Sequence, residues 1–525
     1  MTSPQTTTGA PAWTPPPIPR RSWLAFAVLI LGIAMALLDT TIVNVALPVI
    51  RDSIDADEAT LSWIISGYAL AYGLALIPAG RIGDRIGHKP VFIAGLVIFT
   101  GASLWAGLAD DSTSLVVARV VQGLGGGIFF PAVTAFIQLM FPGPVRGRAF
   151  AIMGATIGFT TALGPLVGGL LIQWLGDAEG WRSIFFVNLP FGVIAVVAAL
   201  ILLPSGAEGK AAGGADLIGL VLLAGGLVAI LVPLIQGQDE GWPAWTYASM
   251  ATGLVLLVLF ALWELWVARR GRSPLVPPHL FSHASFTGGT VLALVYFAAF
   301  TSIFFTISIF WQAGLGHTAL ESGLVSIPFA IGSIFGAAQS NRLAERLGRT
   351  TLSIGTGLVA IGLIALWLVL LSIPAPDLTN WELLGPLLVA GIGSGLFIAP
   401  NAQFIVATVD RSEAGAASGV IGTVQRIGSA IGIAVIGSVF FGNLPGDFGP
   451  TDAQVAAAGQ EFGPQGQDAV KAAIQSIVDH NLAVGFGHSA TIALFVSACF
   501  AVAAFVLVFA LPKRVSRGYE VPSAE

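Results

Sequence analysis

The segment Leu217–Ile235 reads LIGLVLLAGGLVAILVPLI and contains no charged residue. A helix needs about 20 consecutive apolar residues to cross the hydrocarbon core of a bilayer. Runs of this kind recur along the chain of 525 residues, of which 55% are hydrophobic and 10% are charged, whereas soluble domains carry about 25% charged residues. Only helices and closed barrels satisfy their backbone hydrogen bonds in lipid, and long unbroken runs indicate helices. The sequence therefore predicts an all-α integral membrane protein.

The apolar runs predict about fourteen spans. They are expected near residues 23–48, 60–80, 90–108, 115–139, 148–174, 183–203, 216–236, 246–268, 286–311, 320–340, 351–373, 383–407, 415–441 and 488–511. The two central runs, 216–236 and 246–268, are each long enough to cross a membrane. They raise the expected count from twelve to fourteen.

The positions of the basic residues predict the orientation of the chain. Of 23 Lys and Arg residues, 18 fall in segments that a cytoplasmic N-terminus would place inside, three fall outside, and Arg119 and Arg426 lie within spans. Cytoplasmic loops of membrane proteins carry an excess of Lys and Arg. We therefore expect both termini on the cytoplasmic side of the plasma (inner) membrane.

Two pairs of similar segments indicate an internal duplication. GRIGDRIGHKP at Gly80–Pro90 is echoed by NRLAERLGRTT at Asn341–Thr351, and GLGGGIF at Gly123–Phe129 by GIGSGLF at Gly391–Phe397. Parallel repeats of six spans with a substrate site between them are a known transporter architecture. The predicted organisation is a disordered cytoplasmic N-terminus (1–22), a first six-helix bundle (23–203), a linker region with the two extra spans (204–285), a second six-helix bundle (286–511) with a long external loop (442–487), and a cytoplasmic tail (512–525).

Five motifs in order resemble the major facilitator superfamily, and within it the fourteen-span drug:proton antiporters. They are LDTTIVNVALP at Leu38–Pro48, the loop Gly80–Pro90, RVVQGLG at Arg119–Gly125, GPLVGG at Gly164–Gly169 and WRSIFFVNLP at Trp181–Pro190. The resemblance covers roughly residues 23–511. Two positions depart from the family pattern: Thr160 stands where the antiporter motif often has Gly, and the second loop copy has Glu345 and lacks the terminal Lys.

The resemblance implies a major-facilitator-type fold of two six-helix bundles plus two extra central helices. It also implies a proton-coupled antiporter that exports small hydrophobic or cationic drugs by alternating access, driven by the proton gradient without a cofactor, and not an enzyme. The expected partners are a small-molecule substrate, protons and the bilayer, with no nucleic acid and no obligate protein partner. Export of a lipid or endogenous metabolite, or a non-transporting membrane sensor, are the alternatives.

The sequence itself gives little support to other classes of chemistry. It has no GxxxxGK[ST] motif for nucleotide binding and no HExxH pair of histidines. Cys499 is its only cysteine, so that an internal disulfide or a cysteine-based metal cluster is excluded.

Asp39 and Arg119 are the predicted proton-coupling pair. A charged Asp at the centre of a membrane helix costs about 2.5–3.5 kcal/mol on insertion scales, and counting residues at the helical rise puts both side chains at a similar depth. Arg119 is expected to pair with the deprotonated Asp39 and to release it on protonation. The alternatives are a structural hydrogen bond for Asp39 and an Arg119 side chain that extends toward the interface.

Three further groups of residues are predicted to act in gating, packing and substrate contact. The gate or latch loop comprises Gly80, Asp84, Arg85, Gly87 and Lys89. The antiporter motif comprises Gly164, Pro165, Gly168 and Gly169, where close packing of small residues explains most of the pattern. The candidate substrate-cavity residues are Asn44, Trp63, Tyr68, Tyr72, Gln122 and Arg426. Ordinary aromatic packing, a structural partner such as Gln425 for Arg426, and an interfacial position for Glu264 remain open at this stage.

Overall fold

The computed structural model describes residues 18–56, 58–205, 216–237, 240–410, 413–445, 447–451, 453–457 and 467–512. These residues form helices joined by turns, with no strand among them. Thirteen helices are long and apolar enough to cross a membrane, or fourteen if one bent pair counts as a single span. The predicted all-α fold of about fourteen spans is confirmed. Most of the two predicted terminal segments, 1–22 and 512–525, lies outside the described residues.

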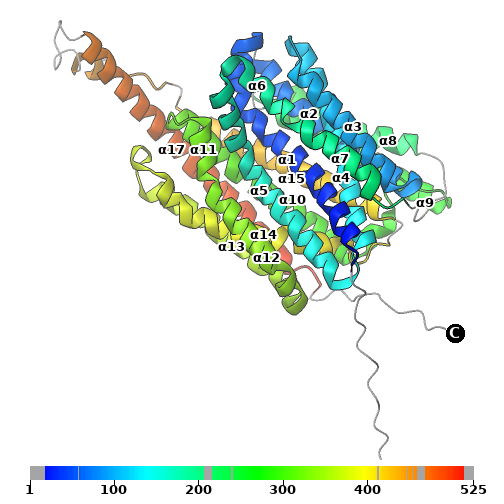
Figure 1. Cartoon of the computed structure of the whole chain (residues 1–525). Helices are drawn as coiled ribbons and strands as arrows, with labels where there is room; N and C mark the ends of the chain where they lie inside the picture. The colour runs from blue at the N-terminus through cyan, green and yellow to red at the C-terminus, as the bar shows by residue number, and fades with distance from the viewer. Residues whose placement is uncertain are drawn as a thin grey trace, which may run out of the picture.

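The helices follow the chain as two halves with an insertion between them (Figure 1). The first half consists of α1 (Arg20–Ile54), α2 (Glu58–Ile86), α3 (His88–Gly107), α4 (Ser112–Met140), α5 (Gly143–Leu175), α6 (Asp177–Phe186) and α7 (Asn188–Leu202). The insertion is α8 (Leu217–Gln236) and α9 (Ala244–Arg269). The second half consists of η1 (Pro278–Ser282), α10 (Ala284–Ile309), η2 (Phe310–Gly314), α11 (Ala319–Val325), α12 (Ile327–Leu347), α13 (Arg349–Ser372), η3 (Ala375–Asp377), α14 (Asn380–Val406), α15 (Ala414–Gly442) and α17 (Gln467–Val508).

The glycine-rich echoes in α4 and α14 make equivalent close contacts in the two halves. The Cα of Gly123 packs against the Tyr68 carbonyl of α2, and the Cα of Gly391 packs against the Phe329 carbonyl of α12. A Cβ at either position would overlap that carbonyl oxygen. The second sequence echo is therefore a packing requirement that recurs because the halves repeat one architecture.

Gly391→Val is expected to destabilise the second half, because the new side chain must push α12 away from α14. Overpacking of a well-packed interior costs about 1–3 kcal/mol, and more when backbone is in the way. Thermal unfolding of the purified protein in detergent should show a lower midpoint. The matched control is Gly385→Val on the same helix, where a Cβ would meet nothing within 4 Å; equal destabilisation by both variants would contradict this account.

The inserted helices pack on one side of the junction between the halves. α8 contacts α2 of the first half and α15 of the second, while α9 packs mainly against α8. Leu223, Leu227 and Leu231 are buried along α8 at helical spacing and belong to the main apolar core. The insertion therefore covers the α2–α15 side of the bundle.

Two helices differ in shape from the simple spans expected. α5 is bent by 44° between Thr161 and Leu166, the break that contains Pro165, because proline frees a backbone carbonyl. The predicted external loop 442–487 is corrected in its second part, since α17 begins at Gln467 and continues to Val508. Polar and apolar residues alternate at helical spacing in the first part of α17, which lowers its hydropathy below that of a span. In Figure 1 this part of α17 extends beyond the body of the bundle.

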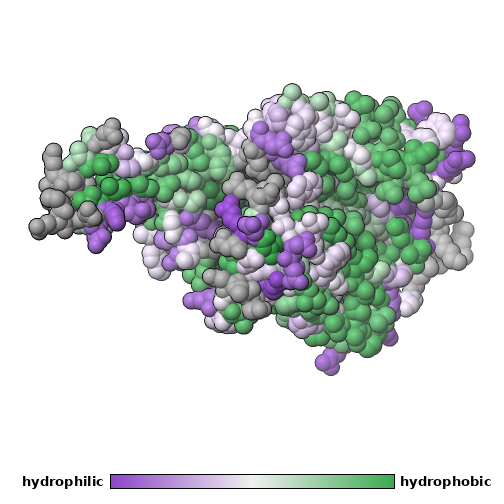
Figure 2. All heavy atoms as spheres, turned by 90° about the horizontal axis from the view of Figure 1, so that it is seen from above, coloured by the Kyte–Doolittle hydropathy of each residue, from purple (hydrophilic) through white to green (hydrophobic). Residues whose placement is uncertain are grey.

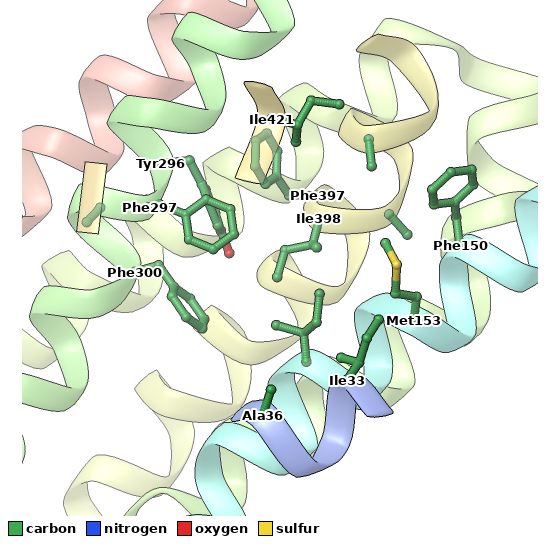
Figure 3. Close-up of a cluster of buried hydrophobic side chains, with 14 of the residues drawn as sticks. Ile33, Ala36, Phe150, Met153, Tyr296, Phe297, Phe300, Phe397, Ile398 and Ile421 are labelled. Atoms are coloured by element: carbon green, nitrogen blue, oxygen red, sulfur yellow. The ribbon is translucent and has the colours of Figure 1, made fainter. Parts of the chain in front are cut away.

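Apolar side chains fill the interior and also cover the outside. Both halves contribute to one cluster, in which Ile33 of α1 and Met153 of α5 lie opposite Phe300 of α10 and Phe397 of α14 (Figure 3). Large apolar residues are also exposed along the outer helices, for example Val193, Ile194, Val197 and Ile201 on α7. Figure 2 shows broad apolar areas on the flanks, as a lipid-facing surface requires.

Candidate functional site

Asp39 is the centre of a buried polar network in the first half. Its Oδ2 accepts a hydrogen bond from Arg119 Nη1 at 2.5 Å, and its Oδ1 accepts from Gln122 Nε2 at 2.8 Å and from Asn188 Nδ2 at 3.0 Å. The Asp39 side chain is 0% exposed and that of Arg119 is 1% exposed. The expected contact between Asp39 and Arg119 is present, and Gln122 joins it. The role of these residues in coupling stays a prediction.

Ser103 and Asn188 complete the network and were not predicted as site residues. Ser103 Oγ accepts hydrogen bonds from Gln122 Nε2 and Asn188 Nδ2, both at 3.1 Å, and donates one to the Phe185 carbonyl at 2.9 Å. Asn188 is the first residue of α7, directly after the break at Val187 that separates α6 from α7. A signal existed for Asn188, because it is a polar residue of the motif at Trp181–Pro190.

Arg119 is held from several sides at once. Its Nε donates to the Ile64 carbonyl at 3.2 Å, and its Nη1 also donates to Gln122 Oε1 at 2.7 Å. The guanidinium lies 4.2 Å from the centre of the Tyr68 ring, and the Tyr68 hydroxyl donates to the Ala36 carbonyl of α1. Tyr68 therefore packs under the ion pair as a cation–π partner and links α2 to α1.

This polar network has no counterpart in α14. With the offset of 268 residues between Gly123 and Gly391, Arg119 corresponds to Leu387 and Gln122 to Ala390. Removing one partner of a buried ion pair costs about 3–5 kcal/mol, because the other charge stays buried without compensation. A proton that neutralised Asp39 would produce that same imbalance at Arg119. The site therefore places one carboxylate against one buried arginine in the first half.

Asp84 joins the two halves at one end of the bundle. Its two carboxylate oxygens accept hydrogen bonds from the backbone N–H groups of Gly415 and Ala416, each at 2.9 Å, at the first turn of α15. A carboxylate at a helix N-terminus is stabilised by the unpaired N–H groups and by the helix dipole. His88 Nε2 lies 3.4 Å from Asp84 Oδ1. The predicted latch residue is thus placed between the halves, where it binds a helix end and, among the described residues, no side-chain charge of the second half.

Two pseudo-equivalent contacts between the halves lie at the same end. The Cα of Gly80 packs against the Gly415 carbonyl, and the Cα of Gly147 on α5 packs against the Asn341 side chain on α12. Gly80 corresponds to Asn341 in the loop echo. The second copy has no buried carboxylate, because Glu345 is exposed and accepts from Asn341 Nδ2 at 3.2 Å.

The other residues of the predicted latch loop have their neighbours in the first half or in the insertion. Gly87 has φ +98°, a conformation that favours glycine, and it separates α2 from α3. Lys89 Nζ donates to the carbonyls of Leu200 and Leu203 at the end of α7, as a cation at a helix C-terminus does. Arg85 is half-buried and has Asp216, at the start of α8, as an electrostatic neighbour.

The predicted antiporter motif lies where α1, α5 and α11 meet. The Cα of Gly164 packs against Thr41, two residues after Asp39, and the Cα of Gly169 faces Leu320 of α11. Gly168 is buried, and Pro165 lies in the bend of α5. These residues bring the second half close to the helix that carries Asp39.

The candidate cavity residues do not form one surface. Trp63 lies with Ser66 and Leu70 against Val232 and Gln236 of α8, where they line a narrow gap. Asn44 is exposed on α1 and Tyr68 is under Arg119. Tyr72 and Arg426 lie together, with the guanidinium 4.1 Å from the centre of the Tyr72 ring.

Glu264, near the end of α9, is buried within the protein. It is 3% exposed, and its Oε2 accepts from the Val276 N–H at 2.8 Å. Its Oε1 and the Asp216 carboxylate both lie against Gly219. Glu264 therefore ties the insertion to the chain that leads into the second half. Among the described residues, no three His, Cys, Asp or Glu side chains gather as a metal site would need.

Comparison with known proteins identifies the family. The model of the Major Facilitator Superfamily matches residues 29–433. The chain is 37% identical over 433 residues to the probable actinorhodin transporter of Streptomyces coelicolor, covering 82% of this chain and 74% of the relative. It is 30% identical to the tetracenomycin C resistance and export protein of Streptomyces glaucescens (82% and 78% covered) and 32% identical to the puromycin resistance protein of Streptomyces alboniger (81% and 83% covered).

Solved structures agree on the fold. The human organic anion transporter MFSD10 superposes with a TM-score of 0.61 at 15% identity, covering 94% of this chain and 100% of the other. The proton:xylose symporter XylE superposes with a TM-score of 0.57 at 14% identity, covering 93% and 95%. With the family model across most of its length and these antibiotic-export proteins among its relatives, the chain is a multi-pass membrane transporter of the major facilitator superfamily.

Proposed function

We propose that this transporter is a proton-coupled antiporter that exports small, largely apolar organic molecules, of the kind that includes antibiotics, by alternating access. The observation that carries the proposal is the buried pair of Asp39 and Arg119, with both oxygens of Asp39 occupied by donors. Ionisable residues inside a membrane mark ion pathways and proton relays. The names of the relatives support export of antibiotics as the task.

One proton is sufficient to drive useful export. A proton that enters through 100 mV releases about 2.3 kcal/mol, and one pH unit adds about 1.4 kcal/mol. The sum supports a concentration ratio of more than 100 for a neutral substrate. The proposed driving force is this gradient alone, without a further cofactor.

The proposed cycle uses the contacts between the halves. Asp84 on the α15 N-terminus and the Gly80–Gly415 contact close the end that carries the basic loops. By the positive-inside rule this end is cytoplasmic, and we place both termini there and the protein in the plasma membrane. Protonation of Asp39 would release Arg119, and that change would reach the latch through α2, which carries both Ile64 and Asp84.

Reconstitution tests the proposal. In liposomes that contain the purified protein and a pH-sensitive dye, adding a substrate on one side should move protons in the opposite direction. An exporter of lipids or of an endogenous metabolite predicts the same flux with those compounds only. A non-transporting sensor predicts binding without any proton flux, and that result across a broad panel would refute antiport.

A further inference from the structure

Arg426 lies in the middle of a membrane-spanning helix and has no anionic partner among the described residues. It lies near the middle of α15 and is half-buried. Among the described side chains its guanidinium contacts Tyr72 at the middle of α2, over the ring and beside the hydroxyl. No described carboxylate pairs with it, and neither Gln425 nor a carbonyl accepts from it in the described part of the chain. A charge at this depth is normally paired.

A second group at the same place lacks an acceptor. The Tyr72 hydroxyl is buried, Arg426 approaches it as a donor, and no acceptor lies within hydrogen-bond reach of it among the described residues. Buried hydroxyl groups are nearly always hydrogen-bonded. An arginine and a phenolic hydroxyl side by side, both able to donate, suit one kind of ligand: an acceptor with negative charge.

The surroundings of this pair are apolar and aromatic. Phe130 lies edge-on to Tyr72 with ring centres 5.9 Å apart. On α15, Ile421 belongs to the cluster in which Phe397 and Phe300 of the second half face Ile33 and Met153 of the first (Figure 3). A ligand bound by Arg426 would therefore have an apolar or aromatic body.

We propose that Arg426, together with the Tyr72 hydroxyl, binds an acidic group, a carboxylate or a phenolate, on an otherwise apolar aromatic substrate. The inference rests on the proposed exporter and defines the charge of its substrate. It replaces the expectation of hydrophobic or cationic substrates for this chain, because a fixed cation at the midplane repels a cationic one. Since Tyr72 and Arg426 belong to different halves, binding would also link the halves.

Matched ligands test the charge preference. Binding is measured in lipid nanodiscs for 1-naphthylacetate, its neutral amide 1-naphthylacetamide and the cation 2-(1-naphthyl)ethylammonium, and for anthraquinone-2-carboxylate and its amide. Wild type should bind the acids most tightly. Arg426→Gln should weaken acid binding by about 10- to 100-fold, as loss of a charge-assisted hydrogen bond does, and should leave the amides within about twofold.

Three further variants separate recognition from structure. Tyr72→Phe keeps the ring and should weaken acid binding about 3- to 10-fold. Arg426→Lys keeps the charge and should recover part of the affinity. Arg342→Gln, at an exposed arginine near the end of α12, should change nothing. Equal losses for acid and amide in Arg426→Gln, or no binding of any acid by wild type, would overturn the inference.

A voltage step gives an independent readout. Export of an anion moves one more charge than export of its neutral amide, whatever the number of protons exchanged. Each charge moved through 100 mV changes the attainable gradient about 50-fold, so that the acid should respond to a potassium–valinomycin step about 50-fold more than the amide. If amides and amines are exported against protons and acids are not, the inference fails while the proposed antiport stands. If acids bind selectively but no probe moves protons, antiport fails and the binding site stands.

Discussion

Asp39→Asn is expected to abolish uphill export. With a pH difference of one unit and 100 mV, wild type should accumulate a neutral substrate more than 100-fold, whereas the variant should only equilibrate it, at a ratio of about 1. The reason is that the amide takes up no proton, and that Asp39 is the carboxylate paired with Arg119 at 0% exposure. Substrate accumulation and proton flux in the same vesicles measure the effect.

The control must separate loss of coupling from loss of folding. Asp39→Asn leaves the Arg119 charge buried without its partner, which costs about 3–5 kcal/mol. The double variant Asp39→Asn with Arg119→Gln removes both charges and should regain thermal stability without regaining coupling. Asp110→Asn, at a carboxylate whose side chain is 91% exposed, should be indistinguishable from wild type. Uphill export that persists in Asp39→Asn and collapses with the pH gradient would remove Asp39 from the mechanism.

Asp84→Ala is expected to open the latched end of the bundle. The variant loses two hydrogen bonds from the α15 N-terminus, to Gly415 and Ala416. Hydrogen bonds to a charged group contribute about 1.5–3 kcal/mol each, so that the closed conformation should lose about two to four decades in population relative to the open one. Asp84→Asn keeps one oxygen acceptor and should fall between wild type and Asp84→Ala.

Spin-label distances measure this shift. The labels are placed at Ile86→Cys and Leu347→Cys, both exposed at the ends of helices in different halves, in a Cys499→Ser background that removes the chain's only cysteine. Asp84→Ala should move the distance distribution to longer values, and Asp110→Ala should not. An unchanged distribution in Asp84→Ala would show that the helix-end contact does not hold the halves together.

Much of the architecture could be predicted because each helix that crosses a membrane requires a long apolar run, which is visible in the sequence. Long apolar runs gave the span count, and the repeated loop and glycine segments gave the two halves. The pairing of Asp39 with Arg119 was also accessible, since each charge lies deep in an apolar span and at a similar depth. The helical start of α17 was missed because residues near Gln467 are too polar to resemble a span.

The contacts of the site that could not be predicted from the sequence are those that depend on which uncharged groups face each other in the folded protein. Ser103 is one small polar residue in an apolar run, and nothing local distinguishes it from a serine that bonds to its own helix. The partner of Asp84 is a backbone amide at Gly415, which has no side chain to mark it. Trp63, Tyr68 and Tyr72 all lie on α2, but they contact α8, Arg119 and Arg426, respectively. The sequence does not show this, because only packing decides which neighbour each ring has.

The position of α8 covers one of the two flanks where the halves meet. In a bundle of two similar halves, a molecule dissolved in the membrane could enter between the halves at two places. One lies between α2 and α15, and the other between α5 and α12. α8 stands across the first of these, in contact with both α2 and α15. Compounds that partition into the bilayer before export would then be collected from one flank only, next to the bend in α5.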